Sequence, residues 1–346
     1  MNAVRMDDAA LWETVPECGV CRSTAWRAAG AVCGRRFAAC SRCGVVRLYD
    51  RVAENRLHLL YAGYYPGADP SPAELDRQLA NPTFAHRLAR LEASVNAGRR
   101  RIFEIGCGDG NFLAFLRRAG WAVGGSEFDA RTAEMVLRRH GIRLFTGDIS
   151  GGETPDGAPF PVIAAYHVLE HVYHPAQWLR AVRRLLDVGG VLHLQVPNHA
   201  SLTRRLTGAA WASLMFPQHV YFYTPRTLAE LLRREGFAVE SATTWDPWHG
   251  PGTVAGSALN AVHRLRTGRI PWTDALPGND LVDGGAEDGR ASRRSAMPVD
   301  PSAQNAMPVR RPRLARRVVD ALAAPLARAE AAAGMGAVVD VLARVA

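Results

Sequence analysis

Two cysteine pairs lie near the N-terminus, Cys18 with Cys21 and Cys40 with Cys43, in the pattern C-x2-C-x18-C-x2-C. Two such knuckles can place four thiolates tetrahedrally around zinc, which stabilises a segment too small to hold its own core. The alternatives are a redox pair and cysteines that are merely buried. Redox CxxC motifs normally begin a helix after a strand, and a second pair would be superfluous. We therefore predict a zinc-ribbon module over residues 1–50 with these four cysteines as ligands of a structural zinc ion.

A glycine-rich turn follows the apolar residues 101–105, with Glu104 just before it and Gly106, Gly108 and Gly110 within it. Glycines allow a tight turn and let the backbone approach a ligand closely. A nicotinamide dinucleotide would favour GxGxxG and would place its pyrophosphate at the following helix. Here the glycines run GxGxG, and the neighbouring acids would repel a pyrophosphate. The turn instead suits a ligand with a cationic amino-acid end.

This turn and four later elements resemble the class I S-adenosylmethionine (SAM) methyltransferases, over about residues 99–245. An acid, Glu127, ends the second predicted strand, and Asp148 and Ile149 follow the third strand. The fourth strand leads into the segment 166–172, which is similar to the LEHV segment of that family, and a Gly-Gly pair precedes the fifth strand. The resemblance implies that Glu127 holds the ribose hydroxyls, Asp148 the adenine amine and Ile149 the ring face. It also implies that Glu104, the three glycines and Tyr166 belong to the SAM site.

Several side chains after the fourth and fifth strands could remove a proton from a methyl acceptor. A neutral imidazole suits that task near pH 7, and the long connection after the fifth strand faces substrate in this fold. We predict His219, and after it His167, as catalytic residues. Glu170, His171 and Tyr221 are the further candidates, and a hydrogen-bonded structural role for His219 is the alternative.

The segment 167–171 also matches the HxxEH spacing of one zinc-peptidase class, but that site needs both histidines on one long helix. Ubiquinone-type O-methyltransferases carry ExxEH at this place and can hold a divalent ion there. Here the first position is His167, which argues against that metal role.

The elements that must position these residues alternate between strands and helices. Apolar runs predict strands at 101–105, 122–127, 143–146, 162–166, 191–196 and 238–243, and amphipathic patterns predict helices at 111–119, 130–140, 176–186 and 225–235. Such alternation indicates βαβ units and a parallel sheet, with ligands at the carboxyl ends of the strands. With the resemblance, this predicts an α/β, seven-stranded Rossmann-like methyltransferase sheet.

The predicted domains are a zinc module (1–50), a helical connector (51–98), a SAM-binding core (99–245), an insertion (246–333) and a last core strand (334–346). Within the insertion, residues 277–312 are rich in Gly, Ser, Asp, Arg and Pro and predict disorder. The helical stretches 254–265 and 315–333 flank it. Basic residues at 310–333 could lie on a membrane surface, whereas a lid or dimer element is the favoured interpretation.

The chain has 346 residues with 48% hydrophobic and 22% charged residues, which suits a globular protein of about two domains. It contains no long apolar span and no signal-peptide core, so we predict a cytoplasmic protein. All 42 basic residues are arginine and the formal charge is +9, which we interpret as a solvated surface.

A methyltransferase core behind a zinc ribbon resembles a bacterial subgroup that includes sugar C-methyltransferases and tailoring enzymes of glycan and secondary-metabolite pathways. The resemblance implies O- or C-methylation of a small-molecule acceptor, with SAM and structural zinc as cofactors. An RNA methyltransferase that uses the zinc module is the alternative, but the N/D-P-P-Y/F signature for a base amine is absent after the fourth strand. A SAM-fold scaffold without activity is the third hypothesis, and the complete glycine turn argues against it.

Overall fold

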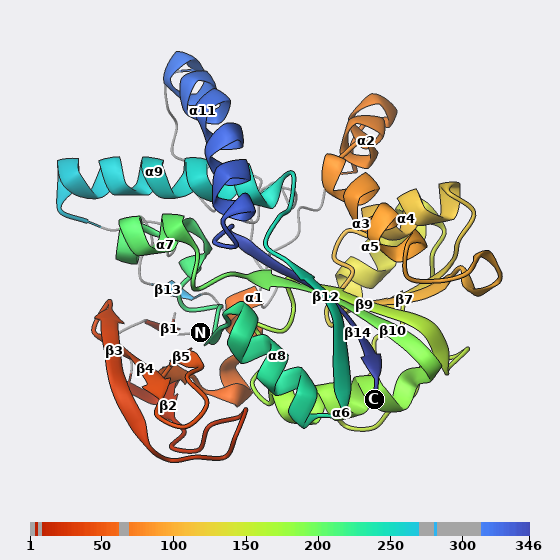
Figure 1. The fold of residues 1–346 in the computed structure, drawn as a ribbon, viewed down its shortest axis with the longest axis horizontal. Helices are drawn as coiled ribbons and strands as arrows, with labels where there is room; N and C mark the ends of the chain where they lie inside the picture. The colour runs from red at the N-terminus through yellow and green to blue at the C-terminus, as the bar shows by residue number, and fades with distance from the viewer. Residues whose placement is uncertain (1–3, 6–8, 62–68, 270–279, 282–312) are drawn as a thin grey trace, which may run out of the picture.

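A six-stranded mixed sheet forms the centre of the computed structural model, which describes residues 4–5, 9–61, 69–269, 280–281 and 313–346 (Figure 1). The strand order is β12-β14-β10-β9-β7-β8. All neighbours pair in parallel except β14, which inserts antiparallel between β10 and β12. The strands are β7 (Arg101–Ile105), β8 (Ala122–Ser126), β9 (Phe160–Tyr166), β10 (Leu186–Pro197), β12 (Phe237–Thr243) and β14 (Val338–Val345).

The prediction of a seventh strand at 143–146 is wrong for the described part of the chain. That segment makes only an isolated bridge between Ser126 and Phe145. Phe145 exchanges backbone hydrogen bonds with Gly125 and Glu127, and the ladder does not extend further. An edge segment this short has one neighbour only, and Arg143 and Thr146 are exposed, so little burial stabilises a longer strand.

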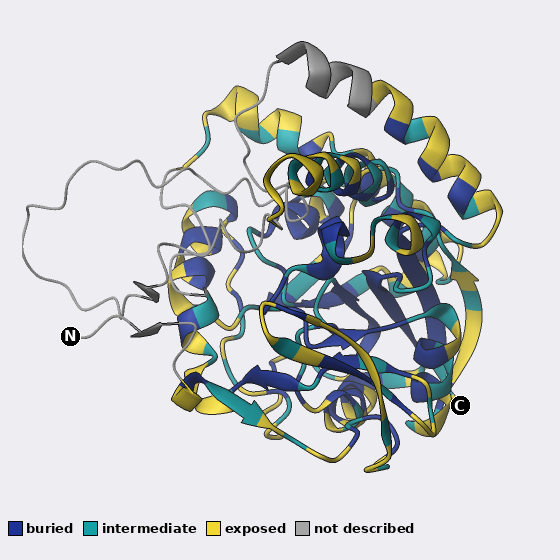
Figure 2. Ribbon diagram, turned by 90° about the vertical axis from the view of Figure 1, so that its left-hand side faces the viewer, coloured by how far each residue is buried: buried dark blue, intermediate teal, exposed yellow. Residues whose placement is uncertain are grey.

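Helices cover both faces of the sheet, as Figures 1 and 2 show. One face packs against α6 and α8 through a core that includes Ile163, Leu179 and Leu231. The other face packs against α3 and α4, with α5 beside them. The helices are α3 (Pro82–Glu92), α4 (Asn111–Arg118), α5 (Ala130–His140), α6 (Pro175–Leu185) and α8 (Pro225–Arg234).

The N-terminal module forms a smaller, four-stranded sheet. One of its edge strands, β11, comes from a much later part of the chain. Its order is β11-β5-β4-β3, with β3 (Trp26–Val32), β4 (Arg35–Cys40), β5 (Val46–Leu48) and β11 (Tyr221–Phe222). A two-stranded ladder joins β2 (Trp12–Thr14) to β6 (Asp50–Val52), and α1 (His58–Tyr61) and α2 (Pro72–Leu79) follow. Because β11 pairs with β5, the loop that carries His219 contributes a strand to the sheet of the N-terminal module.

The C-terminal part adds two long helices that pack against each other, α9 (His249–Thr267) and α11 (Arg313–Ala332). The short α7 (Leu202–Thr207) packs on α9. The segment predicted to be disordered, 277–312, lies outside the described residues except for β13 (Asp280–Leu281), which pairs with β1 (Val4–Arg5). In the described part no helix is long and apolar enough to cross a membrane.

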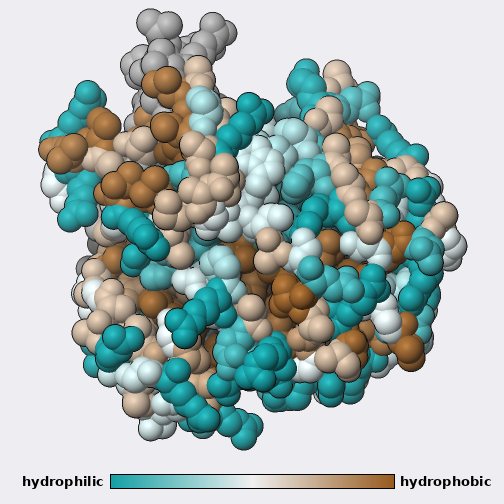
Figure 3. Space-filling view, viewed as in Figure 1, coloured by the Kyte–Doolittle hydropathy of each residue, from teal (hydrophilic) through white to brown (hydrophobic). Residues whose placement is uncertain are grey.

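Part of this helical layer is apolar and exposed. Leu265 on α9 is 86% exposed, and Leu206, Leu322 and Leu326 on α7 and α11 are also largely exposed. Figure 3 shows hydrophobic side chains over these helices, next to hydrophilic ones. The contact of 310–333 with a membrane therefore stays a prediction, with Leu322 and Leu326 as its apolar component.

Candidate active site

The glycine turn between β7 and α4 has the backbone that only glycine tolerates easily. Gly106, Gly108 and Gly110 have φ values of +66°, +56° and +72°, in the left-handed region. A Cβ atom at Gly106 would lie 2.7 Å from Val168, so the turn packs directly against the loop after β9. The two loops therefore form one surface at the carboxyl ends of β7 and β9.

Two carboxyl groups flank this turn. Glu127, directly after β8, accepts hydrogen bonds from the N–H groups of Gly108 (3.0 Å) and Phe128 (2.9 Å). Glu104 is 4% exposed, and its Oε2 atom has no hydrogen-bond partner among the described residues. Burial raises the pKa of Glu104 to about 8; the Arg87 guanidinium opposes this shift, and the Asp109 and Glu127 carboxylates add to it. A buried carboxyl group without a partner is a site for a cationic ligand.

Three more predicted SAM residues lie in the connection between α5 and β9 or at the end of β9. Asp148 is exposed and Ile149 is buried. Both lie shortly after Phe145, whose backbone hydrogen bonds join this segment to the end of β8. Tyr166 ends β9, and its hydroxyl already bonds to His193 Nδ1 at 2.8 Å. The roles of these three residues toward SAM stay predictions.

Five polar residues from three segments meet beside the glycine turn. Glu170 is 1% exposed, and His167 Nδ1 and His219 Nε2 lie 3.5 and 3.9 Å from its Oε1 atom. The rings of His171 and His219 meet edge to face at 4.6 Å, and those of His167 and His249 lie 4.3 Å apart. The structure therefore brings both predicted catalytic residues, His219 and His167, into one cluster.

The electrostatics of this cluster follow from its burial. Burial lowers the pKa of His167, His171 and His219, and it raises the pKa of Glu170 to about 7. The three histidines are therefore neutral at pH 7.

Three of these side chains fit a divalent metal ion. Glu170, His171 and His219 bring ligand atoms within 4.8 Å of one another. The Nδ1 atoms of the two histidines lie 3.1 Å from the Gln218 carbonyl and 2.9 Å from the Ser213 carbonyl. Because a carbonyl only accepts, each Nδ1 carries the proton and each Nε2 keeps a lone pair, as in many metal-binding histidines. This set includes His219 and omits His167, so it differs from the ExxEH pattern.

The four cysteines predicted to bind zinc converge as well. Their Sγ atoms lie within 4.8 Å of one another, with 3.5 Å between Cys21 and Cys40 and 3.7 Å between Cys18 and Cys43. Tetrahedral zinc with Zn–S bonds of about 2.3 Å would separate the sulfurs by about 3.8 Å. The donor set therefore fits zinc. Cys33 is exposed and lies outside the cluster.

Sequence reasoning missed a second layer of polar residues around the site. Asp246 and His249 belong to the segment treated as an insertion, yet they contact the site through His167. Arg87 on α3 donates to Gln195 at 2.8 Å and stacks on Tyr166. The only sequence signal for Asp246, His249 and Arg87 as site residues is a polar side chain among apolar neighbours.

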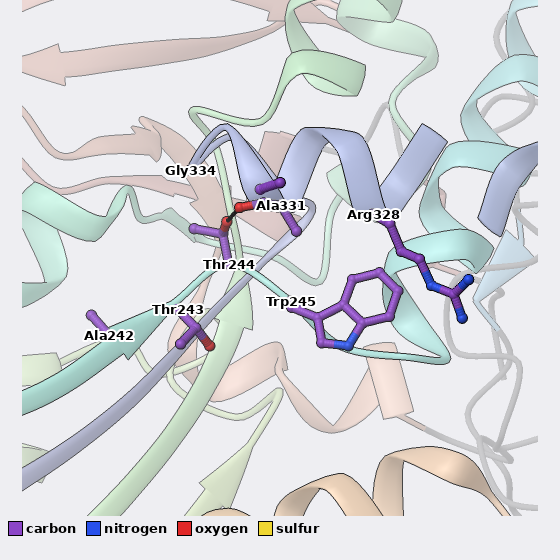
Figure 4. Close-up of a pocket in the computed structure, with 8 residues that line it drawn as sticks. Ala242, Thr243, Thr244, Trp245, Arg328, Ala331 and Gly334 are labelled. Carbon is purple, nitrogen blue, oxygen red and sulfur yellow. Dashed lines mark hydrogen bonds between the residues drawn. The ribbon is translucent and has the colours of Figure 1, made fainter. Parts of the chain in front are cut away.

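A separate open pocket of about 490 Å³ lies between the end of β12 and α11, and contains none of the predicted site residues. Figure 4 shows Trp245 and Arg328 on its wall, with the guanidinium 5.9 Å from the indole ring centre. Thr244 donates to the Ala331 carbonyl beside them. We assign it no role in methyl transfer.

Comparison with known proteins gives consistent results. Residues 74–242 match a family described as "Methyltransferase domain". The chain is 30% identical over 220 residues to a ubiquinone biosynthesis O-methyltransferase of Xylella fastidiosa (strain M23), covering 58% of this chain and 87% of that protein. It is 27% identical over 198 residues to a probable SAM-dependent methyltransferase of Mycolicibacterium smegmatis, covering 55% and 74% of the two chains.

Among solved structures, a SAM-dependent methyltransferase from Archaeoglobus fulgidus aligns with a TM-score of 0.44 at 15% identity, covering 83% of this chain and 99% of that one. Both relatives from Xylella fastidiosa and Mycolicibacterium smegmatis are named as methyltransferases. The chain belongs to the class I SAM-dependent methyltransferases.

Proposed function

We propose that this enzyme methylates a hydroxyl group of a small molecule, such as a sugar or a phenolic secondary metabolite. The observation that carries the proposal is the cluster of Glu170 and four histidines beside the glycine turn. Neutral imidazoles next to a cofactor site suit the removal of a hydroxyl proton. The name of the relative from Xylella fastidiosa, an O-methyltransferase, supports oxygen rather than carbon as the acceptor atom.

The chain's own residues would hold SAM at the carboxyl ends of β7, β8 and β9. Glu127 would accept from the ribose hydroxyls, Asp148 would accept from the adenine amine, and Ile149 would cover the ring. Glu104 would face the cationic methionine end, because its buried Oε2 atom has no hydrogen-bond partner among the described residues. When bound, SAM supplies a methyl group on a positive sulfur, so the protein's task is alignment and proton removal.

Zinc would be structural in this scheme. The cysteine cluster belongs to the module whose sheet includes β11, and the N–H groups of Val220 and Tyr221 in turn donate to the Glu170 carbonyl. Zinc at the cysteines would therefore fix the segment that carries His219. A divalent ion held by Glu170, His171 and His219 would supply a Lewis acid that lowers the pKa of an acceptor hydroxyl.

The test is methyl transfer from SAM labelled in the methyl group to three acceptor panels: phenols and catechols, nucleotide sugars, and ribosomal RNA. We expect label in the first or second panel, and mass spectrometry with NMR then locates it on oxygen. Label on carbon would support C-methylation instead. Label in RNA only, with binding that weakens steeply with salt, would support the alternative function.

A further inference from the structure

The pair formed by Asp246 and His249 is built like a catalytic dyad. Asp246 is fully buried, and its Oδ1 lies 3.1 Å from His249 Nδ1. The same oxygen accepts from the Thr83 hydroxyl of α3 at 2.8 Å and from the N–H groups of Trp248 and His249. Because the carboxylate accepts, Nδ1 carries the ring proton and Nε2 keeps its lone pair.

Contacts along the chain connect this dyad to the cofactor turn. Gly106 packs against Val168, and His167 is the residue before it. The ring of His167, which has a left-handed backbone with φ of +57°, lies 4.3 Å from the ring of His249. His249 therefore contacts, through the His167 ring, the loop after β9 that packs against the glycine turn at the carboxyl end of the sheet.

The other three histidines of the cluster lie against the Glu170 carboxylate; for His167, whose side chain is 9% exposed, Nδ1 lies 3.5 Å from Oε1. His219 is 3% exposed, and His171 and His219 both face the Glu170 carboxylate. The side chain of His249 is 12% exposed, whereas that of Asp246 is 0% exposed. A partly exposed ring whose Nδ1 is held by a buried carboxylate has the arrangement of a general base with its orienting group.

We propose that His249, oriented by Asp246, is the base that removes the proton of the acceptor hydroxyl; this rests on the proposed function. His249 Nε2 takes the hydroxyl proton while the acceptor oxygen forms its bond to the methyl carbon. The carbon–sulfur bond breaks, and its electron pair stays on sulfur. The products are the methyl ether, S-adenosylhomocysteine and an imidazolium that releases its proton to water.

The charged and titratable groups around His249 come from three elements. His167 and Glu170 after β9 interact with His249 itself, and His86 and Arg87 on α3 interact with its partner Asp246. The kinetic test therefore compares variants across pH.

The kinetic test uses catechol and 4-nitrocatechol as acceptors, with the zinc-loaded full-length enzyme between pH 6 and 9. For His249→Gln we expect kcat on catechol to fall about 100-fold or more, with KM little changed. The loss on 4-nitrocatechol should be much smaller at pH 8, because its more acidic hydroxyl is already ionised. Asp246→Asn should show the same pattern, and His174→Gln, in an exposed histidine that contacts Glu54 and is not part of the cluster, should behave as wild type. Equal losses on both acceptors, or no loss, would overturn the proposal.

A measurement without an acceptor keeps the proposal testable if neither catechol is methylated. Nitrogen-15 NMR of labelled histidine reports which ring nitrogen of His249 carries the proton, with His249→Gln identifying the signal. We expect the Nδ1–H form in the wild type and its partial loss in Asp246→Asn. An Nε2–H form in the wild type would overturn the proposal, because the lone pair would then face Asp246. Failure of the proposed function itself would appear separately, as no methylation of any acceptor panel.

Discussion

The affinity for SAM should rise with pH below pH 7.5, because Glu104 must lose a proton to hold the cofactor. Burial places the pKa of Glu104 at about 8, so this carboxyl group is mostly neutral in the free protein at pH 7. A cation beside it favours the carboxylate. Binding of SAM should therefore release a proton from Glu104.

The size of the effect follows from the raised pKa. With a pKa of about 8 in the free protein, the ionised fraction of Glu104 grows close to tenfold between pH 6 and pH 7. The dissociation constant should fall by roughly the same factor, about 1.4 kcal/mol of binding free energy. Above about pH 7.7 the amino group of SAM begins to lose its own proton, so the range 6 to 7 is the informative one.

Titration calorimetry in phosphate and in Tris separates proton release from binding, because the two buffers differ in ionisation enthalpy. We expect close to one proton released at pH 6.5 and a flat affinity in Glu104→Gln. Burial also raises the pKa of Glu127, so Glu127→Gln serves as the matched comparison. An affinity constant within twofold between pH 6 and 7, without proton release, would refute the assignment of Glu104.

Three further perturbations probe other parts of the structure. Cys40→Ser should lower the zinc content, measured by metal analysis, and should reduce methyl transfer far more than SAM binding, measured by calorimetry. Cys33→Ser should leave zinc content, methyl transfer and SAM binding unchanged. Equal loss of SAM binding and methyl transfer in Cys40→Ser would contradict this account. Asp340→Ala should lower the free energy of unfolding in urea by about 3 kcal/mol, because Asp340 is a buried carboxylate that binds a histidine, an arginine and a glutamine; a loss below 1 kcal/mol would show that these contacts contribute little. Leu322→Asp with Leu326→Asp should weaken flotation with vesicles rich in phosphatidylglycerol, and flotation equal to the wild type would exclude these leucines from membrane contact.

The sheet could be predicted from the sequence because its strands are apolar runs bounded by turns. Strands β7 and β8 and helix α5 begin where predicted, and the antiparallel last strand was predicted within residues 334–346. The edge segment 143–146 could not be resolved in this way, since its pattern resembles a strand whether or not a ladder extends along it.

The candidate site was only partly predictable. The cysteine pairs and the glycine turn carry their geometry in local spacing, so the convergence of Cys18, Cys21, Cys40 and Cys43 and the tight turn at Gly106–Gly110 could be predicted, while their ligands stay predictions. His249 and Asp246 could not, because their contacts reach Thr83 and His167, which are distant along the chain. The pairing of β11 with β5 was hidden for the same reason, since a two-residue strand has no periodicity of its own.

The most direct test of the central claim is calorimetry of the zinc-loaded protein with SAM, in parallel with Glu127→Ala. We predict micromolar binding by the wild type and binding at least tenfold weaker in the variant, because the loss of a charged acceptor from two ribose hydroxyls costs roughly 1.5 kcal/mol or more. Equal binding by both proteins would contradict the placement of SAM at the carboxyl ends of β7 and β8. No binding by the folded wild-type protein would contradict the methyl-transfer function proposed for this site.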